Sequence, residues 1–164
     1  MAISDSTVAI IGTGNIGGRL AADLAAGGQD FLLAGRDQEA TRKIAADLDG
    51  RAEAVSVDEA VDRAGVLVVA VWLDDFEQFI AQYGARLAGK VIVDPSNPVG
   101  PDEPGGYRKV IGEQESSGQI LAGLRSAGQG VRHAISLDAV RDREARTRAG
   151  GAVLRHRRRR GGRP

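Results

Sequence analysis

The sequence predicts an α/β fold built on a doubly wound parallel sheet. Short apolar runs, typical of strands buried on both faces, recur along the first part of the 164-residue chain. Between them lie segments whose apolar residues are spaced three and four apart, as in helices that cover a sheet. Short connections join the two kinds of segment, which is the pattern of repeated β-α-β units. Right-handed crossovers then predict the strand order 3-2-1-4-5, with a sixth strand left open.

Each element follows from its local pattern. The expected strands are residues 6–11, 30–35, 52–57, 65–72 and 89–98. The fourth, "GVLVVAVW", is the most hydrophobic, and only a central position in the sheet would bury all of it. The expected helices are residues 15–26, 37–48, 58–65 and 75–87.

Helix ends and inward faces are also predicted. Gly27-Gly28 closes the first helix, and Asp37 can act as the N-cap of the second. In the first helix the apolar residues that recur three and four apart are Ile16, Leu20, Ala21, Leu24 and Ala25. In the last, the apolar stripe expected to face the sheet consists of Phe76, Phe79, Ile80, Tyr83 and Leu87.

Composition limits the possible chemistry. The chain has no cysteine, which excludes disulfides, a thiolate nucleophile and cysteine-based metal sites. Its N-terminal segment has no basic region, and its first apolar run is far too short to span a bilayer. We therefore expect a cytoplasmic protein with no membrane partner.

Charge divides the chain into two regions. Residues 1–124 hold 10 Lys and Arg against 19 Asp and Glu, whereas residues 125–164 hold 12 against 3. The second region also lacks sustained apolar periodicity, so it is predicted to be incomplete or disordered. The domain prediction is therefore a nucleotide-binding domain over residues 1–124, followed by an Arg-rich region over 125–164.

A glycine motif lies between the first predicted strand and helix. Gly12, Gly14 and Gly17 have the spacing G-x-G-x-x-G. In a β-α-β unit the first glycine permits a tight turn, the second lets a pyrophosphate approach, and the third lets helix and strand pack closely. The helix start supplies free N–H groups and the positive end of its dipole. The motif predicts dinucleotide binding; the alternative is a glycine-rich corner without a ligand.

The end of the second predicted strand indicates which dinucleotide binds. An NAD site usually has an acidic residue there, but "LAGRD" has Arg36. A guanidinium can pair bidentately with a 2′-phosphate, which favours NADP(H). In the alternative interpretation Arg36 is a solvated loop residue and Asp37 binds the ribose.

The chain resembles the F420-dependent NADP oxidoreductase family over about residues 7–124. The resemblance rests on "IIGTGNIGGRLAADLAAGG", "LLAGRD", "VLVVAVW" and "GKVIVDPSNP". It implies an N-terminal Rossmann domain. It further implies that Thr13, Asn15 and Ile16 hold the pyrophosphate and Arg36 the 2′-phosphate. The nicotinamide half would lie against Ala70, Val71 and Trp72, on a floor of Asn97 and Pro98. Trp72 stands where the family commonly has proline.

The reaction implied by the resemblance is hydride transfer between NADPH and a deazaflavin, coenzyme F420, or a similar small-molecule acceptor. Such chemistry resides in the cofactors, so no catalytic side chain and no metal is expected. Asp94 is interpreted as a strand-end residue that holds the following loop. The Asp74-Asp75 pair is interpreted as a complement to a helix dipole.

The remaining segments carry weaker signals. Residues 100–114 are predicted to be a loop, 116–124 a helix and 131–136 a strand. The basic "RHRRRR" near the end could attract nucleic acid, although this partner is not favoured. Read one base later, one allowed codon choice for this stretch encodes an acidic segment. We therefore expect a truncated or frameshifted reductase that binds NADP(H) with weak or absent turnover. The alternatives are a non-catalytic NADP-binding protein and a nucleic-acid-binding module; a homodimer is left open.

Overall fold

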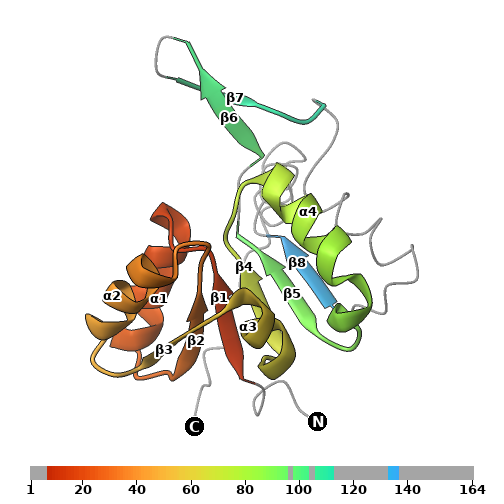
Figure 1. Ribbon diagram of the computed structural model, residues 1–164. Coiled ribbons are helices and arrows are strands. Elements are labelled where there is room, and N and C mark those ends of the chain that lie inside the picture. Colours follow the sequence, from red (N-terminus) through yellow and green to blue (C-terminus); the bar gives the residue numbers. More distant parts are fainter. Residues whose placement is uncertain (1–6, 96–97, 104–105, 113–132, 137–164) are drawn as a thin grey trace, which may run out of the picture.

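The main feature of the computed structural model is one parallel sheet (Figure 1). The structure describes residues 7–95, 98–103, 106–112 and 133–136. Six strands lie in the order β3-β2-β1-β4-β5-β8, which confirms the predicted order 3-2-1-4-5 and adds a sixth strand. Their bounds are β1 Val8–Ile11, β2 Phe31–Ala34, β3 Ala52–Val55, β4 Val66–Val69, β5 Val91–Asp94 and β8 His133–Ser136.

Four α-helices connect the first five strands. Their bounds are α1 Asn15–Ala26, α2 Gln38–Ala46, α3 Val57–Arg63 and α4 Leu73–Tyr83. The side chain of Ser56 caps α3 by accepting a hydrogen bond from the Glu59 N–H at 3.1 Å, so this helix begins just before the predicted Asp58. Helix α4 also differs from the prediction, because Gly84 ends it and a 3-10 turn, η2 Gly84–Leu87, replaces its expected last turn.

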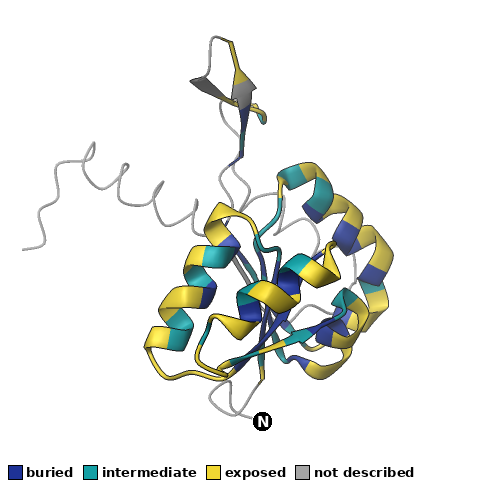
Figure 2. Cartoon of the chain, turned by 60° about the vertical axis from the view of Figure 1, so that its left-hand side comes forward, coloured by how far each residue is buried: buried dark blue, intermediate teal, exposed yellow. Residues whose placement is uncertain are grey.

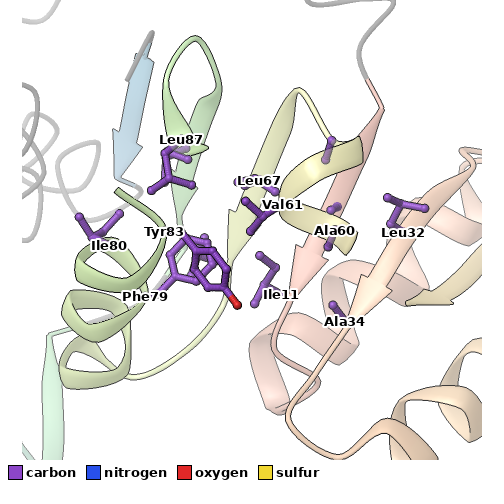
Figure 3. Close-up of a cluster of buried hydrophobic side chains, with 14 of the residues drawn as sticks. Ile11, Leu32, Ala34, Ala60, Val61, Leu67, Phe79, Ile80, Tyr83 and Leu87 are labelled. Atoms are coloured by element: carbon purple, nitrogen blue, oxygen red, sulfur yellow. The ribbon is translucent and has the colours of Figure 1, made fainter. Parts of the chain in front are cut away.

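The two faces of the sheet bury separate hydrophobic clusters. Because side chains alternate along a strand, Ile10 packs on one face while Ala9 and Ile11 pack on the other. Helices α1 and α2 cover the first face through Ala21 and Ala45. Helices α3 and α4 cover the second, where the cluster is larger (Figure 3). It includes all five residues predicted to face inward from the last helix, namely Phe76, Phe79, Ile80, Tyr83 and Leu87.

Burial is distributed as this layered arrangement requires. The inward sides of the helices are buried and their outer sides are exposed (Figure 2). The most hydrophobic strand, β4, pairs with β1 on one side and β5 on the other, so its predicted central position is confirmed. The strand is shorter than predicted, however, and ends at Val69. Trp72, expected inside it, instead precedes α4 with 55% of its surface exposed.

A β-hairpin follows the sheet's fifth strand and corrects the loop prediction for residues 100–114. Strands β6 Val99–Asp102 and β7 Gly106–Lys109 pair antiparallel and extend away from the main sheet (Figure 1). The Val110 N–H donates to the Pro98 carbonyl at 2.9 Å and closes the base of the hairpin. The two strands, VGPD and GYRK, contain no run of apolar residues, so the pattern used to predict buried strands does not detect them.

The sixth strand comes from beyond residue 124. Strand β8 pairs with β5 in parallel, from Val91 opposite His133 to Asp94 opposite Ser136. The predicted strand over residues 131–136 is therefore confirmed, and it belongs to the same sheet as β1 to β5. The predicted helix over 116–124 and the Arg-rich end lie outside the described residues.

Candidate dinucleotide-binding site

The segments that follow β1, β2 and β4 meet at one edge of the sheet. Parallel strands bring their carboxyl ends to the same edge, and the strand order changes direction beside β1. Backbone hydrogen bonds fix these ends to one another. The Gly12 N–H donates to the Ala34 carbonyl at 2.8 Å, and the Ala70 N–H donates to the Ile11 carbonyl at 2.7 Å. The glycine turn therefore sits on a rigid support between its two neighbouring strands.

Two of the three motif glycines are required by the fold itself. Gly12 has φ +106°, a conformation that L side chains rarely adopt, and a Cβ there would overlap the Ala70 carbonyl. A Cβ at Gly17 would overlap the Gly12 carbonyl. These glycines let the turn, α1 and β4 approach closely, so they would be needed with or without a ligand.

Gly14 differs from both, because nothing in the fold requires it. Its φ of −74° and ψ of −167° suit any residue, and a Cβ there would meet no atom within 4 Å. Gly14 is the N-cap of α1, and the first N–H groups of that helix have no partner within the helix. A side chain would fill this space, which is what a closely approaching phosphate would also do.

The start of α1 also lacks the negative groups found at the other helix starts. Asp37 caps α2, Ser56 caps α3, and α2, α3 and α4 all carry acidic residues in their first turns. Among the four α-helices that the structure describes, α1 alone has neither a capping side chain nor an acidic first turn. Neither feature therefore offsets the positive end of its dipole.

Arg36 and Asp37 follow β2 and have different surroundings. The Asp37 Oδ1 accepts hydrogen bonds from the N–H groups of Glu39 and Ala40, both at 3.0 Å. This confirms Asp37 as the N-cap of α2. Arg36 extends into solvent with 88% of its side chain exposed, and its Nη1 lies 3.6 Å from the Asp75 Oδ1 of α4.

Two residues missed by the sequence analysis pack the turn against β2. A Cβ at the buried Gly35 would lie 2.7 Å from the Thr41 Oγ1 and 3.2 Å from the Thr13 Oγ1. Only glycine therefore lets the two loops approach this closely. The buried Thr41 hydroxyl donates to the Asp37 carbonyl at 2.6 Å. The sequence did offer a signal for Gly35, because this glycine ends an apolar run just before Arg36.

Exposed apolar groups lie at the predicted nicotinamide side. Ile16, which the resemblance assigns to the pyrophosphate, has 40% of its surface exposed at the start of α1. Trp72 is more exposed still, while Val71 packs partly against the core and Ala70 is half-buried. An exposed tryptophan beside a glycine turn offers a flat apolar surface to a ring system.

The last predicted site residues follow β5. Pro98 is buried at the base of the β6–β7 hairpin, and Asp94 is buried at the end of β5. Asn97 lies outside the described residues, so its predicted position beside Pro98 in the site stays a prediction.

The strand order, the glycine turn and the uncapped start of α1 define a Rossmann domain of the dinucleotide-binding class. Comparison with known proteins names the family. The sequence matches the NADP oxidoreductase, coenzyme F420-dependent family over residues 7–98, and the chain belongs to that family. The resemblance predicted from the sequence is thereby confirmed. A search of curated proteins gave no match.

Solved structures share the fold. A hypothetical protein from Sinorhizobium meliloti is 26% identical with a TM-score of 0.63, over 79% of this chain and 60% of that one. A protein assigned as an F420-dependent NADP reductase, from an Arthrobacter species, is 17% identical with a TM-score of 0.58, over 88% and 90%. An imine reductase from Myxococcus stipitatus, solved with NADP+, is 20% identical with a TM-score of 0.56, over 77% and 39%. The chain thus spans less than two-thirds of the first and third of these.

Among residues 7–95, 98–103, 106–112 and 133–136, no three His, Cys, Asp or Glu side chains gather where they could ligate a metal ion. Within the same residues, no helix combines the length and apolarity needed to cross a bilayer.

Proposed function

We propose that this chain binds NADP(H) at the glycine turn and transfers a hydride between NADPH and a deazaflavin, coenzyme F420, or a similar small-molecule acceptor. Membership of the F420-dependent NADP oxidoreductase family supports the proposal. The observation that carries it is the open space at Gly14, between two glycines that the fold itself requires. A purely structural corner would not need a third glycine at that position.

The residues around the turn suit the parts of the dinucleotide. The N–H groups at the start of α1, from Asn15 to Gly17, would bind the pyrophosphate beside Thr13. Arg36 would bind the 2′-phosphate, since Asp37 is already engaged as a helix cap. The nicotinamide half would lie toward Ala70, Val71 and Trp72, with Asn97 and Pro98 below.

NADPH, when bound, supplies the hydride at its nicotinamide ring. The protein's contribution is to hold the two rings close together and to exclude water, and it needs no side chain that donates or accepts a proton. The exposed face of Trp72 suits this role, because a flat apolar surface orients a ring without reacting with it.

Cofactor choice can be tested with the only tryptophan in the chain. Trp72 borders the site, so its fluorescence should change when NADPH or NADH is added. We expect NADPH to bind about tenfold more tightly than NADH, because one exposed charge-assisted contact contributes about 1.5 kcal/mol. Arg36→Ala should remove this preference without weakening NADH binding.

Arg51→Ala is the matched control for Arg36→Ala. Arg51 is also an exposed arginine in an ion pair, 3.0 Å from Asp30, but it lies just before β3, at the opposite edge of the sheet. Its replacement should leave the preference for NADPH unchanged. A preference that survives in Arg36→Ala, or equal affinities in the unaltered protein, would remove Arg36 from the proposed role.

Turnover is tested by mixing the protein with NADPH and oxidised coenzyme F420 and following the absorbance of the deazaflavin. We expect the absorbance to fall only when protein and NADPH are both present. Tight NADPH binding without any turnover would favour the non-catalytic alternative. Salt-sensitive binding of nucleic acid that is lost on removal of residues 155–164 would favour the interaction module.

A further inference from the structure

An ion pair joins two of the segments that border the glycine turn. Arg36 follows β2 and Asp75 lies in the first turn of α4, which follows β4. Strands β2 and β4 are the two neighbours of β1 in the sheet. The 3.6 Å contact between the Arg36 Nη1 and the Asp75 Oδ1 therefore links the segments on either side of the turn.

The two partners differ in how firmly they are held. Asp75 is on a helix, its side chain is only 32% exposed, and the positive start of α4 stabilises its charge. Arg36 is on a loop with 88% of its side chain exposed. When a second anion approaches Arg36, the carboxylate will therefore stay in place while the guanidinium adjusts.

A 2′-phosphate at Arg36 would meet this carboxylate. Both groups are negative and both seek the same guanidinium, so they compete for its N–H donors and repel each other at close range. NAD(H) has no phosphate on this ribose and would leave the ion pair undisturbed. Asp75 thus acts on one cofactor and not on the other.

We infer that Asp75 is a positioning residue that competes with the 2′-phosphate for Arg36 and so limits the preference of this site for NADP(H) over NAD(H). The inference rests on the proposed function, because it requires Arg36 to bind the 2′-phosphate. Asp75, in the first turn of α4, would then affect cofactor selection, whereas the residues proposed to hold the nicotinamide half precede this helix.

The test replaces Asp75 by Asn and measures NADPH and NADH binding through Trp72 fluorescence. We expect Asp75→Asn to bind NADPH about fivefold more tightly, about 1 kcal/mol at 1.4 kcal/mol per tenfold change, with NADH affinity unchanged. Asp74→Asn is the matched control, because Asp74 is in the same first turn and also faces the helix dipole. It should change neither affinity.

A double-mutant cycle with Arg36→Ala isolates the interaction. Without Arg36 there is no donor to compete for, so the selective gain of Asp75→Asn for NADPH should be smaller in that background than in the unaltered protein. Thermal unfolding checks that each variant folds. Asp75→Ser, which keeps a polar group at the helix start, serves as a second variant if Asp75→Asn proves unstable.

The possible failures can be told apart. If Arg36→Ala keeps the NADPH preference, the proposed site itself is wrong. If Arg36→Ala loses it but Asp75→Asn weakens NADPH binding, or changes both cofactors equally, only the inference about Asp75 is overturned.

Discussion

Replacing Gly14 by valine would separate the ligand-binding glycine from the structural ones. The backbone at this position is in an extended region open to any residue, and a Cβ there meets nothing within 4 Å. A less favourable N-cap costs less than about 1 kcal/mol, and the smaller entropy of the unfolded chain offsets part of it. We therefore expect the free energy of unfolding to change by no more than about 1 kcal/mol.

Dinucleotide binding should respond very differently. A valine side chain would occupy the space that the pyrophosphate needs and would block the N–H groups at the start of α1. Hydrogen bonds to a charged group contribute about 1.5–3 kcal/mol each, so losing two of them costs about 3–6 kcal/mol. NADPH affinity should therefore fall more than 100-fold, which corresponds to about 2.7 kcal/mol. Gly14→Ala should show a smaller loss in the same direction.

The assay combines calorimetric titration of NADPH with thermal unfolding of the same samples. Gly27→Ala is the matched control, because Gly27 is at the other end of α1 and a Cβ there makes only ordinary contacts of 3.4 Å. Gly17→Ala should show the opposite behaviour and fold poorly, since its Cβ overlaps the Gly12 carbonyl. A folded Gly14→Val protein that binds NADPH within about threefold of the unaltered protein would refute the reasoning.

Two further predictions concern Asp37 and Tyr83. Asp37→Ala should lower the free energy of unfolding by about 0.5–2 kcal/mol, because α2 loses its cap. In fluorescence titrations it should leave the ratio of NADPH to NADH affinity unchanged. A changed ratio would indicate that Asp37 binds the ribose. Burial, followed by the Asp58 carboxylate, raises the pKa of Tyr83, so its contribution to stability is present below about pH 10 and is lost as the pH rises through the raised pKa. In urea unfolding above about pH 10, Tyr83→Phe should therefore lose less stability than the unaltered protein, and equal losses would contradict this.

Local patterns predicted most of the fold because each of them reports on burial. The apolar run at β4 could be buried only at the centre of a parallel sheet, and it lies there between β1 and β5. The stripe from Phe76 to Leu87 predicted the inward face of the segment, although Gly84 divides it into α4 and η2. The β6–β7 hairpin was not predicted, because VGPD and GYRK contain no run of apolar residues.

The candidate site was predictable only where one residue's role depends on its immediate neighbours. The glycine spacing and the Asp37 cap are local, and the structure has both in the expected form. The ion pair between Arg36 and Asp75 is not local, because 39 positions separate its members in the sequence and only the order of β2, β1 and β4 brings them together. Asp75 could be interpreted from sequence as a partner of its own helix dipole, and it does lie in that first turn. Its second partner, Arg36, lies nearby only because of the strand order in the sheet. The proposed effect of Asp75 on cofactor choice therefore depends on the fold and not on any sequence motif.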